Sequence, residues 1–461
     1  MMSCKKEGKK AGYYFGRLIL AGTVILAISI FGVSCSNSSG NSDYDTEESV
    51  ETVAAEETKI EYFPIRVTGD LHDSVVLEHG AKTKHGYYEV ISWPPDMIPE
   101  NCGEILYGNI VYTDYDSCRR VYLCNIPGCA HNTPDCTSFV SYSGSWTLFT
   151  DYSEQHLYFV SKGRHVRDAS SADLATITEM GMDGSERRTV CVLQANESFR
   201  SNTVIVASDE YVYATTTHTG FVDNGPIDQY VLERIWFADG KREIVCQLLN
   251  NYEKDETLLS VWGNEELIIN ECVNEDENVR GIYRCRVSQS GELIERFGPE
   301  STFGYYSDKF RITGKEEDKK AVVTAIDYET GKSVTIENVP AETRSPGRIV
   351  IYVRDGDRIN WTFFDENEKN RDYILDFSDG TFKELTLRQR NTYEDRAIAI
   401  IADAGDSYLV AVGEKKSSIT LTDLEGIPHT YELRNYPEYA LISKEDYWNC
   451  IPDYKMIEDM V

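Results

Sequence analysis

Short runs of alternating apolar and polar residues recur along most of this chain, and polar turns bound each run, as at 156–160, 211–213 and 267–269. A period of two residues is typical of strands that bury one face, so the pattern predicts short β-strands. Six of these units close on a glycine turn, at Gly184, Gly240, Gly291, Gly331, Gly380 and Gly426. Successive glycines lie 40 to 56 residues apart, and a strand-rich repeat of that length indicates propeller blades.

Pairing each opening strand with its closing glycine divides the chain into six approximate blades, at residues 145–195, 196–250, 251–298, 299–338, 339–386 and 387–435. Further alternating runs at 86–91, 109–112 and 120–123 predict a seventh blade upstream. We therefore predict an all-β fold, a β-propeller with seven blades, with six or eight as the alternatives. Propellers leave only short, protected sheet edges, so we expect one blade to combine strands from both chain ends, with 89–91 and 439–442 as candidates.

The longest insertions between paired strands are expected at residues 163–172 and 218–229. Loops on a rigid scaffold often form binding surfaces. The alternative is that both are tolerated surface insertions without a role.

Residues 1–34 have the plan of an export signal peptide, with five basic residues against one acidic residue, followed by an apolar run at 18–33. That run is shorter than the roughly 20 residues of an independent membrane span. The segment Gly32-Val33-Ser34-Cys35 resembles the lipobox of bacterial lipoproteins, although Gly32 stands where leucine is usual. We predict lipidation at Cys35, and an uncleaved signal anchor is the alternative. Both place the bulk of the protein at the extracytoplasmic face of a cell membrane.

Residues 35–58 are polar and acidic, so they are predicted to form a disordered tether, or alternatively a tail that docks a basic partner. Removal of the signal peptide changes the formal net charge from −31 to −35. Such a charge argues against nucleic acid as a partner and against adsorption to an anionic lipid surface. Membrane attachment then depends on the N-terminal lipid anchor, and residues 59–461 form the predicted propeller.

One excursion, residues 124–136, concentrates metal-ligand residues in a C-x4-C-x-H-x4-C string: Cys124, Cys129, His131 and Cys136. Structural zinc takes four such ligands in a tetrahedron, and tight turns within each pair bring them onto one ion. Pro127-Gly128 and Pro134 provide such turns. The string therefore predicts a metal site, with zinc as the candidate cofactor.

A disulfide is the competing interpretation, because clustered cysteines of exported proteins usually oxidise. Cys124 with Cys136 would staple the excursion, and Cys272 with Cys285 would pair across a hairpin. Ten cysteines remain beyond Cys4 and Cys35, an even number that permits complete pairing. Free thiols are a third possibility.

The segment from Leu123 to Cys136 also resembles a signature, Leu-Cys-x-x-Pro-x-Cys-x-His-x-x-x-x-Cys, of uncharacterised lipoproteins from clostridial-type bacteria. The closing residues 442–449 are similar to the end of the same group. That resemblance implies an envelope-anchored propeller similar to the low-density-lipoprotein-receptor type, a domain of unknown function. It supplies no catalytic residues.

We assign no catalytic residues from the sequence, because acids at opening turns such as Asp151, Asp209 and Asp308 ordinarily bond the local backbone. The predicted function is a non-enzymatic, ligand- or protein-binding propeller on a membrane anchor, with an envelope protein, a peptide or a glycan as partner. The alternative is an extracellular carbohydrate-active enzyme, a glycosidase or lyase, which needs convergent carboxylates.

Overall fold

A computed structural model describes most of the chain after residue 60. The described residues are 61–70, 80–98, 105–163, 174–201, 203–222, 225–251, 253–276, 279–297, 303–306, 310–317, 319–327, 330–341, 350–365, 369–392 and 396–460. The predicted signal peptide (1–34), the tether (35–58) and Cys35 lie outside these ranges. Residues 60–461 form one compact unit, and the description below concerns that unit alone.

The described residues form seven β-sheets, numbered here in chain order. Sheet 1 contains β2 (Ala81–Lys82), β3 (Gly86–Ser92), β4 (Ile105–Asp114), β5 (Arg119–Tyr122), β6 (Phe139–Ser143) and β32 (Glu458–Asp459). Sheet 2 contains β7 (Trp146–Thr150), β8 (His156–Ser161), β9 (Thr176–Gly181) and β10 (Arg188–Val192). Sheet 3 contains β1 (Arg66–Asp70), β11 (Glu197–Phe199), β12 (Val204–Ala207), β13 (Tyr211–Val222), β14 (Gly225–Trp236) and β15 (Arg242–Leu248).

The other four sheets have four strands each. Sheet 4 contains β16 (Lys254–Trp262), β17 (Glu266–Asp276), β18 (Val279–Val287) and β19 (Leu293–Phe297). Sheet 5 contains β20 (Phe303–Tyr306), β21 (Phe310–Glu317), β22 (Lys320–Asp327) and β23 (Ser333–Pro340). Sheet 6 contains β24 (Val350–Asp355), β25 (Arg358–Phe364), β26 (Asn370–Asp376) and β27 (Thr381–Glu384). Sheet 7 contains β28 (Ala399–Ala404), β29 (Ser407–Thr422), β30 (Pro428–Ser443) and β31 (Tyr454–Met456).

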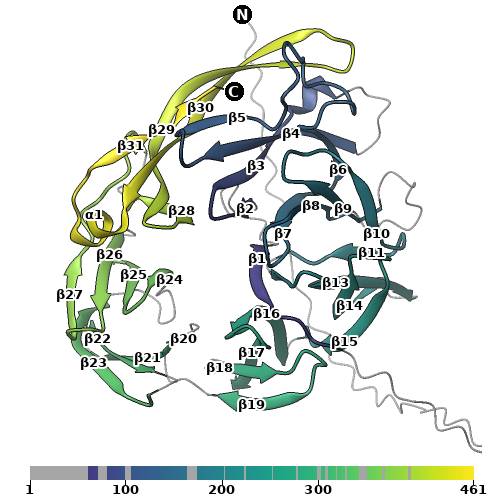
Figure 1. Ribbon diagram of the computed structural model, residues 1–461. Helices are drawn as coiled ribbons and strands as arrows, with labels where there is room; N and C mark the ends of the chain where they lie inside the picture. Colours follow the sequence, from purple (N-terminus) through teal and green to yellow (C-terminus); the bar gives the residue numbers. More distant parts are fainter. Residues whose placement is uncertain are drawn as a thin grey trace, which may run out of the picture. The chain divides into compact units, whose positions relative to one another are not determined.

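The sheets follow one another around a ring (Figure 1), so the fold is a β-propeller, as the repeat predicts. All six closing glycines have φ between 66° and 86°, a left-handed conformation that glycine adopts without a steric penalty. The blade count stays a prediction, and the seven sheets are the number that a seven-bladed ring requires.

Apolar faces of neighbouring sheets pack against each other. Between sheets 2 and 3, for example, the ring of Tyr158 stacks on Phe149 and on Phe237, with centroids 4.8 and 4.3 Å apart. Between sheets 5 and 6, the fully buried Trp361 packs with Ile312. Inner strands such as β7 and β8 therefore bury both faces, one against each neighbouring sheet, whereas the alternation alone indicated one buried face.

One sheet does combine strands from both chain ends, because β32 joins sheet 1, but the candidate pair of 89–91 with 439–442 is wrong. Residues 89–91 belong to β3 in sheet 1, and residues 439–442 belong to β30 in sheet 7. The chain instead turns after β30 through helix α1 (Lys444–Asn449), adds β31 to sheet 7 and reaches sheet 1 with β32, which pairs in parallel with β5. β31 therefore occupies the edge of β30 on which residues 89–91 were expected to pair.

Helix α1 and one turn of 3-10 helix at Pro95–Met97 are the helical elements in the described part of the chain. Ser443 caps α1 by accepting a hydrogen bond from the Asp446 amide (3.0 Å). No described helix has the length and apolarity that a membrane span requires.

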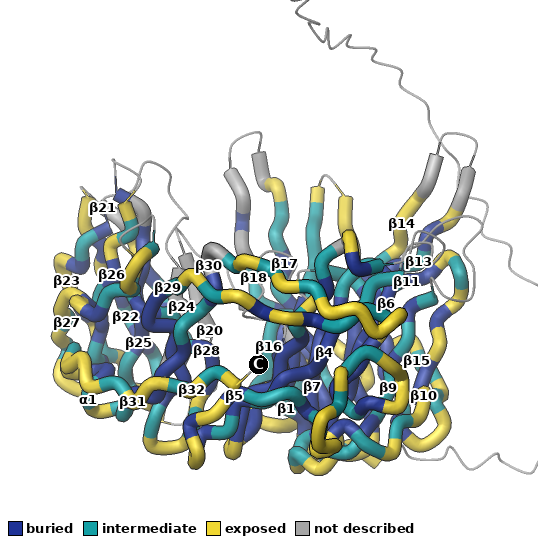
Figure 2. Tube along the Cα trace, turned by 90° about the horizontal axis from the view of Figure 1, so that it is seen from above, coloured by how far each residue is buried: buried dark blue, intermediate teal, exposed yellow. Residues whose placement is uncertain are grey.

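The expected loop at 218–229 is mainly strand, because β13 and β14 pair continuously from Tyr211↔Trp236 to Val222↔Gly225. The alternation of polar and apolar residues is lost there because Gly220 and the run Asp223-Asn224-Gly225-Pro226 interrupt it, and this is why the segment resembles a loop. Figure 2 shows this hairpin and that of β17 and β18 rising from the same edge of the ring. The other expected loop lies outside the described residues from 164 to 172.

Candidate metal centre

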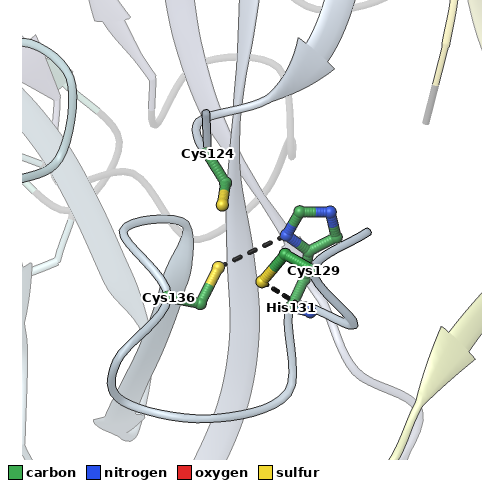
Figure 3. A group of neighbouring side chains, drawn as sticks. All are labelled: Cys124, Cys129, His131 and Cys136. Carbon is green, nitrogen blue, oxygen red and sulfur yellow. Dashed lines mark hydrogen bonds between the residues drawn. The ribbon is translucent and has the colours of Figure 1, made fainter. Parts of the chain in front are cut away.

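The four predicted ligands, Cys124, Cys129, His131 and Cys136, converge at one point beside sheet 1 (Figure 3). Their three sulfurs and the imidazole nitrogen all lie within 4.8 Å of one another. His131 Nδ1 is 3.3 Å from Cys136 Sγ. The excursion between β5 and β6 therefore brings all four side chains together, and the group can bind a metal ion.

Two tight turns give the excursion its shape. Gly128 and His131 both have positive φ, 70° and 56°, and the Cys129 amide donates to the Ile126 carbonyl (3.2 Å). The His131 amide then donates to Cys129 Sγ (3.4 Å). Because this amide points at sulfur, it stabilises negative charge on the thiolate form of Cys129.

Neighbouring polar groups orient the cluster. The buried Asn109 of β4 donates to the His131 carbonyl (2.7 Å) and accepts a hydrogen bond from Trp93 Nε1 (2.7 Å). Ser138 Oγ lies 3.2 Å from Cys136 Sγ. The His131 ring stacks on Tyr122 with centroids 4.3 Å apart. Metal ligands are commonly held by such outer partners.

Burial and hydrogen bonds move the pKa values of the ligands apart. Burial lowers the pKa of His131, so its imidazole is neutral near pH 7. Burial raises the pKa of Cys129 to about 11. Burial acts on Cys136 as well, but hydrogen bonds from Ser138 outweigh it and lower the pKa of that thiol. Metals bind the neutral imidazole and the thiolate. His131 is therefore in its binding form near pH 7, whereas the thiol of Cys129 must lose its proton when a metal binds.

The nine cysteines that the structure describes are all free thiols, and Cys102 lies outside the described residues. The expected pair of Cys272 and Cys285 is wrong, because the β17–β18 register sets Cys272 opposite Ile282 and Cys285 opposite Ile269. Cys191 is buried in the core between sheets 2 and 3.

Two of the acids named at opening turns, Asp151 and Asp209, accept hydrogen bonds from backbone amides. Asp151 accepts from the amides of Gln155 (2.6 Å) and His156 (3.1 Å). Asp209 accepts from the Ser153 amide of the neighbouring sheet (2.7 Å). Asp308 lies outside the described residues. Asp151 thus bonds its own turn, as the sequence predicts, whereas Asp209 bonds the opening turn of the neighbouring sheet rather than its own.

Sequence reasoning missed the residues that support the cluster, Asn109 and Ser138. Asn109 lies 15 residues before the first ligand, inside an apolar strand. A lone asparagine in the middle of such a strand, where asparagine is depleted, is the signal that could have pointed to it. The chain is thus a β-propeller that carries a cysteine/histidine excursion with its own supporting polar groups.

No protein-family model matches the chain, and no curated protein matches it. Among solved structures, the chain is similar to oligogalacturonate lyase from Vibrio parahaemolyticus, with 11% identity and a TM-score of 0.42 over 84% of this chain and 92% of that chain. It is similar to the propeller domain of the Trilobed protease from Pyrococcus furiosus, with 9% identity and a TM-score of 0.43 over 87% and 97%. Acylaminoacyl peptidase from Pyrococcus horikoshii shows 11% identity and a TM-score of 0.44 over 86% of this chain and 52% of that chain, so the chain spans about half of that protein.

Proposed function

We propose that this protein is a non-enzymatic binding propeller, anchored at the extracytoplasmic face of a cell membrane by a lipid on Cys35, whose cysteine/histidine cluster holds a structural zinc ion. The convergence of Cys124, Cys129, His131 and Cys136 carries the proposal. Its partner is an envelope protein, a peptide or a glycan.

The chemistry of the donor set supports zinc. Three sulfurs and one imidazole make a closed, soft ligand set that suits a four-coordinate structural ion. Zinc–sulfur bonds of about 2.3 Å in a tetrahedron place ligand atoms about 3.8 Å apart. The ligand atoms, all within 4.8 Å of one another, need to move by less than an ångström or so to reach that geometry.

A polar pocket of about 770 Å³ supports the binding role. It lies where sheets 2, 3 and 4 meet, beside the β13–β14 hairpin, and its lining includes Lys162, Arg200, Asp228, Tyr230 and Asp255. Arg200 lies 4.1 Å from the centroid of the Tyr230 ring and pairs with Asp255 (3.1 Å). Donors, acceptors and an aromatic ring suit a polar ligand such as a peptide or a glycan.

The carboxylates of a second pocket already have protein partners. This pocket, about 410 Å³, is lined by Glu154 and Asp403. Glu154 pairs with Arg66 (3.0 Å) and accepts from the Lys84 amide (3.0 Å), and Asp403 pairs with Lys444 (2.8 Å). Both acids hold neighbouring strands and turns in place.

X-ray absorption at the zinc edge of the purified full chain in detergent tests the metal proposal. We expect three sulfur scatterers near about 2.3 Å and one nitrogen near about 2.0 Å. A spectrum with only oxygen and nitrogen neighbours contradicts it. Mass spectrometry of the protein from the membrane fraction tests the anchor. A lipidated chain should begin at Cys35 and carry an added acyl mass, whereas a chain that retains residues 1–34 contradicts lipidation at that residue.

A further inference from the structure

The hairpin of β29 and β30 extends well beyond sheet 7. β28 pairs with β29 only up to Ala411, and β31 pairs with residues 440–442 of β30. The two long strands continue to pair with each other as far as Thr422↔Pro428. We call residues 413–438 the hairpin arm, and Figure 1 shows it, in yellow, passing over β4 and β5 of sheet 1.

Two irregularities in the register let the arm leave its sheet, between Ala411 and Gly413 and between Lys415 and Ser417. At the first of them, Gly413 lies directly against the Arg390 backbone, and a Cβ there would overlap the Arg390 carbonyl oxygen. The register shift and the close contact at Gly413 therefore fix the bend at which the arm leaves sheet 7.

The arm buries apolar side chains against the metal cluster. Ile419 and Leu421, which point from β29, are 4% and 3% exposed. They belong to one apolar cluster with Trp93, Phe139 and the ligand Cys136, and the ligands Cys124 and Cys129 are partly buried against the same cluster. The surface that the arm contacts is therefore made in part by the metal ligands.

A polar contact fixes the tip of the arm next to a ligand. Asn132, which directly follows His131, donates its side-chain amide to the Asp423 carbonyl (2.6 Å). The Asp423 carboxylate accepts from the Ile427 amide (2.8 Å) and lies 2.8 Å from His429 Nε2. The tip is thus internally ordered and meets the excursion at one defined point.

Few backbone hydrogen bonds close the ring elsewhere at this seam between sheets 1 and 7. β32 has two residues, and the amides of Glu458 and Met460 donate to the carbonyls of Cys118 (2.8 Å) and Arg120 (2.9 Å). Within the excursion, the Cys129 and Cys136 amides make local turns. Beyond these turns, the Asn109 side chain holds the His131 carbonyl (2.7 Å) and Cys136 packs against Phe139. A metal ion on the four converging ligands would link both halves of the excursion directly, so its binding would fix their relative positions.

We propose that the metal ion stabilises the closure of the propeller ring. The ion fixes the excursion of sheet 1 in the shape on which the hairpin arm of sheet 7 docks, so metal binding and ring closure are coupled. This inference rests on the proposed zinc site. Coupling between two binding events is reciprocal, so undocking the arm must weaken metal binding by the same factor by which metal loss weakens docking.

The test measures zinc affinity of the full chain by competition with a chromogenic chelator, in the wild type, Leu421→Ala and Thr420→Ala. Leu421 is buried against the cluster, whereas its neighbour Thr420 is exposed and bonds Thr430 across the arm (3.0 Å). Neither residue is a ligand. We expect Leu421→Ala to weaken zinc binding about tenfold, a coupling of ordinary size for linked sites, and Thr420→Ala to bind as the wild type does.

Hydrogen–deuterium exchange supplies the second measurement. Removal of zinc by a chelator should speed exchange in residues 417–433 and 454–460 and leave sheet 4 unchanged. If Leu421→Ala binds zinc as tightly as the wild type, the proposed coupling between the hairpin arm and the metal is wrong, although the zinc site itself is confirmed. If the wild type binds no zinc, the proposed metal site itself is wrong.

Discussion

Three of the six closing glycines lie directly against the backbone of the preceding blade. A Cβ on Gly184 would overlap the Thr137 carbonyl, one on Gly240 would overlap the Val190 carbonyl, and one on Gly291 would come within 2.6 Å of the Val245 carbonyl. A Cβ on Gly331 would meet nothing within 4 Å. In some blades glycine is therefore required both by the left-handed backbone conformation and by close packing. In others, such as that of Gly331, only the backbone conformation requires it.

This difference predicts unequal effects of alanine. Gly331→Ala should lower the free energy of unfolding by about 1 to 2 kcal/mol, the strain of a left-handed alanine. Gly240→Ala adds a clash with Val190 and should lower it by a further 1 to 3 kcal/mol or so. Urea unfolding monitored by tryptophan fluorescence measures both, and equal effects of the two substitutions would contradict the packing argument.

At the scale of the element, one buried carboxylate joins the four strands of sheet 4. Glu271 of β17 pairs with Lys254 of β16 (3.1 Å) and Arg296 of β19 (2.8 Å), and accepts from Cys285 Sγ of β18 (3.1 Å). Burial by itself would raise the pKa of Glu271, but these donors outweigh it and hold the pKa below its usual value. Burial and the bond to the Glu271 carboxylate raise the pKa of Cys285 to about 12.

Glu271→Gln should therefore lower the free energy of unfolding at pH 7 by about 2 to 3 kcal/mol, the size of a hydrogen-bonded charged group. Because the folded-state pKa lies below the unfolded one, the carboxylate stabilises the protein above about pH 4.5 and loses that effect as the pH falls through the folded-state pKa. The difference between wild type and variant should then shrink as the pH falls below about 4.

Glu292, an exposed residue in the turn between β18 and β19, provides the control. Glu292→Gln should leave the free energy of unfolding unchanged at pH 7 and at pH 3. A difference between wild type and Glu271→Gln that persists undiminished at pH 3 would show that the charge of Glu271 does not stabilise sheet 4.

At the scale of the whole molecule, a buried ion pair lies at the seam between sheets 1 and 7. Arg120 pairs with Glu89 (2.9 Å), and both side chains are 4% exposed. The Arg120 guanidinium also lies over the rings of Tyr436 and Tyr439 from β30, 5.1 and 5.3 Å from their centroids. The neighbouring pair of Arg119 and Glu458 is more than half exposed.

Arg120→Met should lower the free energy of unfolding by about 3 to 5 kcal/mol, because it leaves the Glu89 carboxylate buried without a cation, with only the Tyr439 hydroxyl (3.3 Å) still donating to it. Arg119→Met, the matched surface change, should lower it by less than about 1 kcal/mol. The double variant Arg120→Met with Glu89→Leu should regain much of the loss. Comparable losses in the two single variants, measured by chemical unfolding, would contradict the assignment of Arg120 as the central contact of the seam.

The fold was predictable from sequence because its signal is local and repeated. Each predicted blade contains several alternating strands and closes on one glycine turn, and the turns from Gly184 to Gly426 predict six of them. The closing strand was not predictable, because two residues at Glu458–Asp459 carry no periodicity and follow a helix that turns the chain back. The four ligands were predictable from their spacing, whereas Asn109 and the arm residue Leu421 reach the cluster only through tertiary packing, which spacing does not encode.

The central claim is that Cys124, Cys129, His131 and Cys136 hold one metal ion per chain. Metal analysis and thiol titration of the purified full chain test it most directly, with Cys136→Ser as the variant and Cys450→Ser, at a cysteine outside the cluster, as its control. We predict one zinc ion per chain in the wild type and in Cys450→Ser, and its loss in Cys136→Ser. A wild-type protein without zinc, with a disulfide between two cysteines of residues 124–136, would contradict the account.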